Sequence, residues 1–482
     1  MTTNLLMLIT LIISSSLTIQ HSTASSTPPA CPRRPDFPKE ALPTKSGYLP
    51  ISPNSTSAIF YTYYKAQQSP ISPQPKPTPI LIWLQGGPGC SSMLGNFFEL
   101  GPYLVSECNP DSKNQTRVVL KPNPGSWNRI FDLLFFDNPI GSGFSIASDP
   151  GEVPKNQNTV AKHLYAALTG FLALDPDFMT RPVYITGESY AGKFIPSIGY
   201  HILKRNEELP VSKRVNLAGI AIGNGMTDPV IQVTTHAATA YFLGLINERQ
   251  RNEVEKVQTK AVKLVEAKKW RQAARARNRV LRLVKKLTGL ATDFDFTRKQ
   301  PYKTGLVTRF LRSKDVKRKL GARESIEFVG CNRTIRSGFR GEVMKSVKRK
   351  VEVLVRKVGK VLLYQGSYDL RDSVASSEAW IKTMKWDGLE RFLVAERKVW
   401  RVLGNGDLAG YVQSYGGLSH VVVLGAGHMV QADQGVNSQA MIEDWVLERG
   451  LFGGEEEGKD LLSSELKESN VRNICCNKYI VH

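Results

Sequence analysis

Nucleophilic chemistry is suggested first by Ser189, in the stretch RPVYITGESYAGKFIP at residues 181–196. Residues 183–185 are β-branched and aromatic, which favours a strand, and a helix can begin at Ala191. A strand, a tight turn and a helix in this order are typical of a nucleophile elbow, which presents a serine hydroxyl above a sheet. The turn needs small residues on both sides of the serine, and Gly187 and Ala191 meet that need. Alanine replaces the usual second glycine, and the pattern also fits an ordinary strand–helix junction.

A nucleophilic serine needs a base, and on such a sheet the base is a histidine that follows the acid in the chain. Three histidines fit that order, namely His420, His428 and His482. His482 ends a polar tail and His420 begins an apolar strand, whereas His428 lies in a Gly-rich loop directly after that strand. Because sheets of this kind place functional groups at the carboxyl ends of strands, His428 is the favoured base.

The orienting acid is expected in the loop after the apolar strand at residues 361–364. Asp369 lies five residues beyond this strand in a Gly-containing turn, and Asp372 is the fallback. Either aspartate also fits a plain loop-capping role.

Acyl transfer also needs N–H donors for the oxyanion of its transition state. One donor is expected from Tyr190, which follows the nucleophile, and the other from the Gly86–Gly87 turn. The GGPG run also fits a simple turn, but the whole stretch at residues 83–92 favours a functional site.

The elements that must position these groups are apolar strands alternating with helices, which predicts an α/β protein with a mostly parallel sheet. The 482 residues are 41% hydrophobic, enough for a large core. Strands are expected at residues 47–49, 58–64 and 183–185, and buried strands at residues 80–84, 133–137, 217–223, 361–364 and 421–424.

The chain divides into five predicted parts. Residues 5–13 form a short apolar run before polar small residues, which predicts a signal peptide cleaved near Ala24. The parts are a signal peptide at 1–24, core segments at 25–246 and 351–453, an inserted helical cap region at 247–350, and a polar tail at 454–482.

The net charge of +21 is concentrated in residues 251–290, which hold thirteen Lys and Arg against three Glu. The favoured interpretation is a solvated helical face, and the alternative is contact with a polyanion. Zinc-ligand spacing, RNA-binding aromatic patterns and heptad repeats are absent from the sequence, so we expect no metal, cofactor or nucleic-acid partner. The oligomeric state is left open.

Six motifs are distributed along the chain together with the Asp369 turn: WLQGGPGCSS (83–92), FFELGP (97–102), DNPIGSGFS (137–145), TGESYAGKFIP (186–196), GNGMTDP (223–229) and GAGHMV (425–430). With these motifs the sequence resembles the serine carboxypeptidases, in particular the plant serine carboxypeptidase-like group. The resemblance extends from about Lys39 to Gly453 and follows the family's order.

This resemblance implies an α/β-hydrolase fold and removal of C-terminal residues from peptides through an acyl-enzyme. It implies Ser189 as nucleophile, His428 as base and Asp369 as acid. It also places the oxyanion donors at the N–H groups of Gly87 and Tyr190.

The resemblance further implies that Gln85, Glu99 and Glu188 bind the substrate's terminal carboxylate, with Trp83 and Gly86 contributing to the same site. Two carboxyls held close together cannot both ionise at low cost, so one stays protonated and can donate to a carboxylate. We therefore expect an acidic optimum. Gln85 replaces the family's usual Asn, and Gln431 stands where many members have Pro.

A disulfide between Cys90 and Cys331 is implied by the same resemblance, and it would tie the insertion to the oxyanion turn. Glycosylation acceptors of the N-x-[ST] kind occur at Asn54, Asn114 and Asn332. Together with the signal peptide, these features predict the secretory pathway, with an extracellular destination or, as the alternative, a vacuole.

Two competing functions remain. Plant relatives with the same triad transfer acyl groups from glucose esters to alcohols, but they typically carry GDSYSG, whereas this chain has Glu188 and Ala191. An inactive binding or scaffolding protein is disfavoured because Ser189, Asp369 and His428 are all present in fitting loops.

Overall fold

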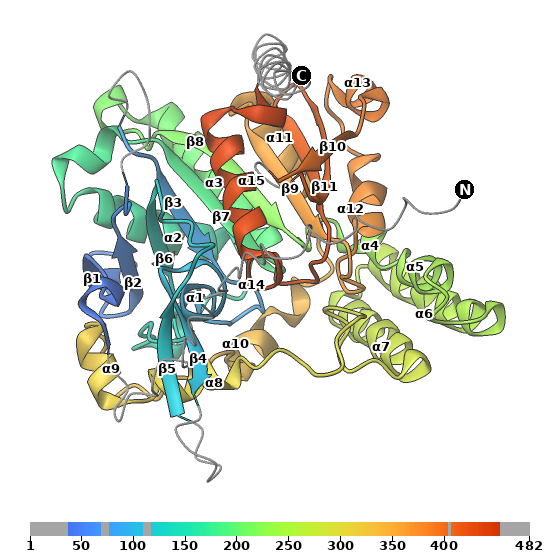
Figure 1. Cartoon of the computed structure of the whole chain (residues 1–482), viewed down its shortest axis with the longest axis horizontal. Coiled ribbons are helices and arrows are strands. Elements are labelled where there is room, and N and C mark those ends of the chain that lie inside the picture. The colour runs from blue at the N-terminus through green and yellow to red at the C-terminus, as the bar shows by residue number, and fades with distance from the viewer. Residues whose placement is uncertain (1–36, 69–76, 109–116, 403–405, 454–482) are drawn as a thin grey trace, which may run out of the picture.

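The computed structural model describes residues 37–68, 77–108, 117–402 and 406–453. Its centre is a ten-stranded sheet (Figure 1). In spatial order the strands are β1 (Lys45–Pro50), β2 (Ala58–Tyr64), β6 (Asp132–Phe136), β3 (Ile80–Leu84), β7 (Val183–Glu188), β8 (Leu217–Gly223), β9 (Val361–Gly366), β12 (Leu418–Val423), β11 (Leu408–Tyr415) and β10 (Lys398–Arg401).

The six middle strands, from β6 to β12, are parallel, whereas β1, β2, β11 and β10 add antiparallel edges. Every residue of β3, β7, β9 and β12 is buried, as expected for strands covered on both faces. The predicted α/β-hydrolase fold is therefore confirmed. The sequence did not predict the edge strands β10 and β11, nor the separate hairpin of β4 (Tyr103–Cys108) and β5 (Arg117–Pro122).

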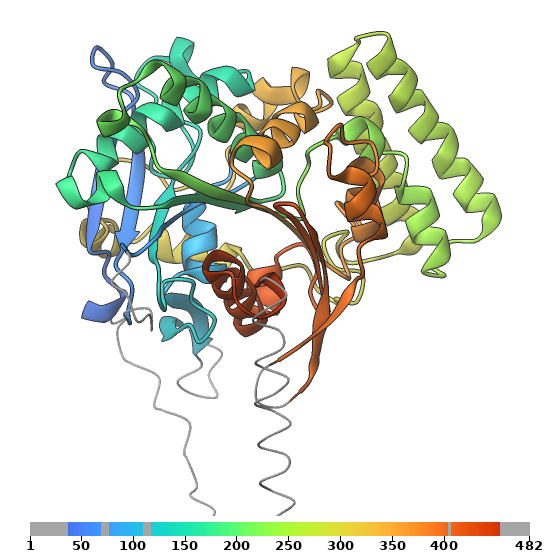
Figure 2. The ribbon, with the colours of Figure 1, turned by 90° about the horizontal axis from the view of Figure 1, so that it is seen from above.

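Helices cover both faces of the sheet (Figure 2). One face packs against α2 (Gln157–Leu172), α3 (Ala191–Glu208), α11 (Lys348–Lys357) and α12 (Val374–Ile381). The other face packs against α1 (Ser92–Leu94), the short helix Gly95–Leu100 and α15 (Gly435–Leu447). Because all parallel strands end at the same edge, the loops after β3, β7, β9 and β12 meet there.

The chain between β8 and β9 forms two helical groups. The helices α5 (His236–Phe242), α6 (Glu248–Glu266) and α7 (Trp270–Thr288) share a small core of their own. By contrast, apolar residues of α8 (Gly305–Leu311) and α9 (Lys314–Lys319) join the core beneath the β4–β5 side. The segment at 247–350 was expected as one cap, but its helices lie in two places: α6 and α7 on one side of the molecule, and α8 and α9 on the other side, near β4 and β5 (Figure 1).

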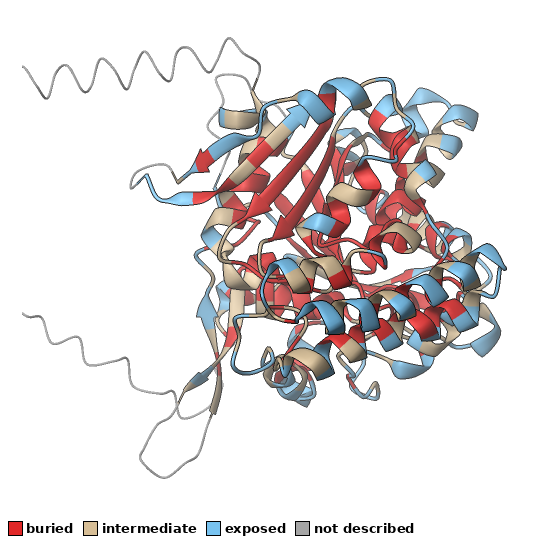
Figure 3. Ribbon diagram, turned by 90° about the vertical axis from the view of Figure 1, so that its right-hand side faces the viewer, coloured by how far each residue is buried: buried red, intermediate tan, exposed pale blue. Residues whose placement is uncertain are grey.

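The α6–α7 pair is amphipathic, with buried positions toward the protein and exposed positions outward (Figure 3). The predicted signal peptide and polar tail lie outside the described residues, as does Asn114. Within the described ranges, no helix is both long and apolar enough to cross a membrane.

Candidate active site

Ser189 lies in a tight turn between β7 and α3. Its φ of 60° is in the left-handed region, which is uncommon for a residue with a side chain and recurs at functional sites. The Ser189 amide donates to Gly223 O at 2.9 Å, and its carbonyl accepts from the amides of Gly192 and Met226 at 2.9 Å each. A Cβ at Gly187 would lie 2.1 Å from Leu84 O, which explains the glycine before the nucleophile.

The predicted base and acid lie together at the carboxyl ends of β12 and β9. His428 Nδ1 and Asp369 Oδ2 are 2.7 Å apart, and both side chains are buried. Asp369 Oδ2 also accepts from Asn224 Nδ2 at 2.7 Å, and Oδ1 accepts from the Arg371 amide at 2.7 Å. Asn224 was not predicted. A signal was available in the sequence, because Asn224 lies in the GNGMTDP motif directly after an apolar strand.

The His428 ring stacks on Phe294, with centroids 4.4 Å apart, and the His428 amide donates to Phe294 O. Burial opposes protonation of the ring, but the charge and hydrogen bond of Asp369 outweigh it and raise the pKa of His428 above its usual value. Among the described residues, Nε2 has no hydrogen-bond partner, so no bond to Ser189 Oγ is formed here. Such bonds are often loose before substrate binds.

The other acid and base candidates have different partners. Asp372 forms a 3.5 Å ion pair with Arg277, and His420 Nε2 lies 2.6 Å from Gln365 Oε1 within the sheet. Desolvation lowers the pKa of His420 to about 4, which leaves its ring neutral. His482 lies outside the described residues.

The two turns expected to form the oxyanion hole touch each other. A Cβ at Gly86 would lie 2.6 Å from Tyr190 N and 2.7 Å from Glu188 O, so only glycine fits. Gly87 has a φ of 111°. Within the part of the chain that the structure describes, no acceptor pairs with the amide of Gly87 or Tyr190. Both N–H groups are therefore available to a ligand.

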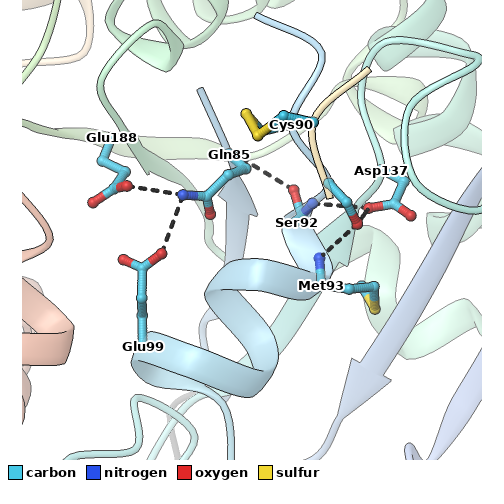
Figure 4. The surroundings of a disulfide bond; sticks show 9 residues. Gln85, Cys90, Ser92, Met93, Glu99, Asp137 and Glu188 are labelled. Carbon is cyan, nitrogen blue, oxygen red and sulfur yellow. Dashed lines mark hydrogen bonds between the residues drawn. A yellow bond between two sulfur atoms is a disulfide. The ribbon is translucent and has the colours of Figure 1, made fainter. Parts of the chain in front are cut away.

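Beside Ser189, a buried amide joins two buried carboxyls (Figure 4). Gln85 Nε2 donates to Glu188 Oε1 at 2.8 Å and to Glu99 Oε1 at 3.1 Å. Desolvation raises the pKa of Glu99 to about 7. Desolvation and the charge of Glu99 raise the pKa of Glu188 well above its usual value. The Oε2 atoms of both glutamates are buried and have no partner among the described residues.

Trp83 differs from the expectation that it contributes directly to substrate binding. It is fully buried and packs edge-to-face against Trp127 at 5.5 Å. Its Nε1 donates to Gln85 Oε1 at 2.8 Å, which fixes the amide so that Nε2 faces the two carboxyls. Trp83 therefore positions Gln85 from the core. Gln431 is also buried and donates to the hydroxyl of Tyr364.

The oxyanion turn is anchored on both sides (Figure 4). A disulfide joins Cys90 to Cys331, which lies next to α10 (Arg333–Gly338). Asp137 accepts from Ser91 Oγ at 2.6 Å and from the Ser92 amide at 2.8 Å. The DNPIGSGFS motif was recognised in the sequence, but this anchoring role was not.

The remaining predicted site residues concern glycosylation and metals. Asn54 is exposed, whereas Asn332 is half-buried, caps α10 and donates to Gly141 O at 2.9 Å. Both acceptor sites stay predictions. The described residues contain no cluster of side chains that would hold a metal ion.

The fold, the elbow and the loops define a hydrolase of the α/β type, and comparison with known proteins gives its family. Residues 35–448 match the serine carboxypeptidase family, and the chain belongs to it. It is a serine-type carboxypeptidase.

One relative is serine carboxypeptidase-like 50 of Arabidopsis thaliana, which is 54% identical and covers 91% of this chain and 95% of its own. The venom serine carboxypeptidase of Apis mellifera is 33% identical over 82% of each chain. Among solved structures, the prohormone-processing carboxypeptidase Kex1 of Saccharomyces cerevisiae has a TM-score of 0.73 and 25% identity. That likeness covers 85% of this chain and 92% of Kex1.

Proposed function

We propose that Ser189, His428 and Asp369 remove the C-terminal residue of peptides through an acyl-enzyme. The observation that carries this proposal is the buried Gln85–Glu99–Glu188 cluster beside the elbow. An ordinary esterase has no need for two raised-pKa carboxyls next to its nucleophile, whereas a carboxypeptidase must recognise a free carboxylate.

In the first half-reaction, His428 Nε2 takes the proton of Ser189 as Oγ attacks the scissile carbonyl. The N–H groups of Gly87 and Tyr190 stabilise the oxyanion. His428 then gives the proton to the departing amine, and the C–N bond breaks. In the second half-reaction His428 activates a water, which cleaves the ester and restores the Ser189 hydroxyl. Asp369 and Asn224 keep the imidazole in the required orientation throughout.

Recognition of the terminal carboxylate follows from protonation of the carboxyl pair. The Oε2 atoms of Glu99 and Glu188 point to no internal partner, so a protonated carboxyl can donate there. Since the pKa of Glu99 is about 7, the donor on Glu99 is present below that pH, and above it a negative charge replaces this donor. The raised pKa of His428 works from the other side, because the base must be neutral. Together these groups favour a mildly acidic optimum.

The competing function is acyl transfer from a glucose ester to an alcohol. Glu188 favours hydrolysis, because its longer side chain reaches Gln85 and completes the carboxylate site. Ala191 is buried against the elbow, where the acyltransferase pattern has Ser.

One assay separates these functions. Purified enzyme is given a blocked dipeptide with a free carboxylate, the matching C-terminal amide, and a phenolic glucose ester with an alcohol acceptor. Release of the terminal amino acid from the free acid, abolished in Ser189→Ala, supports the carboxypeptidase. Transfer from the glucose ester without peptide hydrolysis contradicts it.

We also propose entry into the secretory pathway after removal of residues 1–24, with delivery outside the cell or to a vacuole. The Cys90–Cys331 disulfide supports an oxidising compartment. N-terminal sequencing of the mature protein checks this proposal, because retention of the first 24 residues would contradict it.

A second partner is proposed for the outer face of α7, an anionic polysaccharide. Five exposed basic residues recur there at spacings of four, four, three and four, which places them along one stripe of the helix. No ion pair joins any of them to an acid within the described residues. The stripe consists of Arg271, Arg275, Arg279, Arg282 and Lys286.

A further inference from the structure

A cavity of about 280 Å³ lies beside the candidate oxyanion hole. Gly87 and Tyr190, whose amides are the proposed oxyanion donors, line it together with Met226. Met226 also binds the backbone of Ser189 through its amide. The cavity therefore adjoins the proposed site of bond cleavage, and its volume of about 280 Å³ leaves room for a side chain.

The other walls of this cavity are strongly basic. Five arginines contribute to its lining, and they come from α7, from α10 and the short helix Phe339–Gly341, and from the loop after β9. No aspartate or glutamate lines it among the described residues. We call this site the arginine cavity, and its arginines are Arg277, Arg333, Arg336, Arg340 and Arg371.

The positive charge of the arginine cavity is only partly neutralised from within. Arg371 pairs with Asp293 at 2.8 Å, whereas Arg277, only 2% exposed, lies 3.5 Å from its acid partner Asp372. Desolvation lowers the pKa of Arg277 to about 10, and Arg371 adds to this effect.

The three arginines from the α10 side have no ion pair to an acid in the described part of the chain. Desolvation and the charge of Arg371 lower the pKa of Arg336. Crowded guanidinium groups that partly lack water favour an anion between them.

The arginine cavity and the carboxyl pair are separate sites. None of Gln85, Glu99 and Glu188 lines the arginine cavity, which is bounded instead by Gly87, Pro88 and Tyr190. If the carboxyl pair holds the terminal residue, the leaving group departs there. The residue that becomes the acyl group must then occupy a different site, and the arginine cavity borders the same proposed oxyanion donors.

We infer that the arginine cavity selects peptides with an acidic side chain, Glu or Asp, at the penultimate position. The inference rests on the proposed carboxypeptidase function and names the acyl-side specificity of that same site. A carboxylate entering the cavity would meet the planar guanidinium groups of α7 and α10, which suit bidentate pairing. A lysine there would meet repulsion, and a neutral residue would leave the arginines unpaired.

The test compares N-blocked dipeptides that end in Phe and carry Glu, Gln or Lys at the penultimate position, in phosphate-free buffer near pH 6. We expect kcat/KM for Glu to exceed that for Gln by about tenfold or more, and Lys to be the poorest substrate. In Arg336→Gln/Arg340→Gln, the Glu-to-Gln ratio should fall severalfold. The control Arg309→Gln/Arg349→Gln, with exposed arginines outside the cavity, should keep both ratio and activity.

A binding measurement tests the preference for penultimate Glu without any contribution from bond cleavage. Calorimetry on Ser189→Ala should show tighter binding of the Glu peptide than of the Gln peptide, and the double arginine variant should lose the difference. Equal kcat/KM and equal affinity for Glu and Gln overturn the acidic preference and leave the carboxypeptidase standing. If none of the three peptides is hydrolysed, both the proposed carboxypeptidase function and the inferred acidic preference are overturned.

Discussion

Two clusters of opposite composition lie near the elbow of Ser189, and both suit a carboxylate. In the first, Glu99 and Glu188 are joined by Gln85 and buried in the core. In the second, five arginines line the arginine cavity. The first cluster can hold an anion only while its own carboxyls carry protons, whereas the second is charged at every physiological pH.

The difference teaches that one substrate can be recognised under two kinds of control. Under the proposed function, docking of the terminal carboxylate depends on pH, because the pKa of Glu99 is raised to about 7. Under the inferred preference, selection on the acyl side depends on ionic strength, because three of the arginines are exposed and open to screening. The predictions below test that separation.

The largest expected effect is loss of the shared nucleophile. Ser189→Ala should lower kcat/KM for the blocked Glu–Phe peptide by about 10⁴-fold or more, as for other triad serines. Both clusters should still bind the peptide, with affinity near that of the wild type by calorimetry. Loss of peptide binding together with activity, in a protein that keeps its thermal unfolding transition, would show that the clusters depend on Ser189.

The next effect concerns pH. Two substrates are compared: a blocked dipeptide with a free C-terminal carboxylate, and the same dipeptide with that carboxylate esterified. The ratio of kcat/KM for the free acid to kcat/KM for the ester should fall about tenfold or more from pH 5.5 to pH 8.5. The reason is that Glu99 is protonated below about 7 and ionised above it, where its negative charge would repel the substrate carboxylate. Glu99→Gln removes this ionisation, so the fall should shift to higher pH. A ratio that is constant with pH would contradict carboxylate recognition by the pair.

Salt should act on the other cluster. Raising NaCl from 50 to 500 mM should reduce the Glu-to-Gln preference at the penultimate position by roughly threefold, because screening weakens exposed guanidinium contacts. The same salt change should alter the free-acid-to-ester ratio less, since Glu99 and Glu188 are buried. The arrangement is contradicted if salt weakens terminal-carboxylate recognition more than penultimate selection.

The smallest effect separates the arginine cavity from the basic stripe on α7. Arg275→Glu/Arg282→Glu should elute earlier from heparin, while the preference for penultimate Glu stays unchanged. The matched control Lys213→Glu/Lys382→Glu alters exposed lysines elsewhere and should elute later than the stripe variant. If the two variants elute at the same salt concentration, heparin binding depends only on the net charge of the protein, and the stripe is not a binding site.

Much of the site was predictable from the sequence, because its parts are local. The elbow, the glycine turn and the loops of Asp369 and His428 each follow a recognisable strand, and a parallel sheet brings strand ends together. The fold class followed from the same alternation. The position of α10 and the division of the insertion into two helical groups could not be predicted in this way, because they depend on which apolar face each helix buries.

The arginine cavity could not be predicted for a different reason. Arg277 lies in a helix whose other basic residues are exposed, and its spacing from Ala273 and Leu281 places it on the inner face without indicating what it meets there. Arg336 and Arg371 are brought close to it only by tertiary packing. Phe294, which stacks on His428, lies in an irregular segment without a motif. Such long-range contacts leave little trace in local composition.

The Cys90–Cys331 link has a consequence for how this enzyme can diversify. Four of the five cavity arginines belong to the insertion, while the triad belongs to the core. Substitutions in α7 or α10 can therefore change which acyl group is accepted without altering bond cleavage. The disulfide holds the α10 side of the arginine cavity next to the oxyanion turn. The substrate preference of the cavity can therefore change while the triad stays the same.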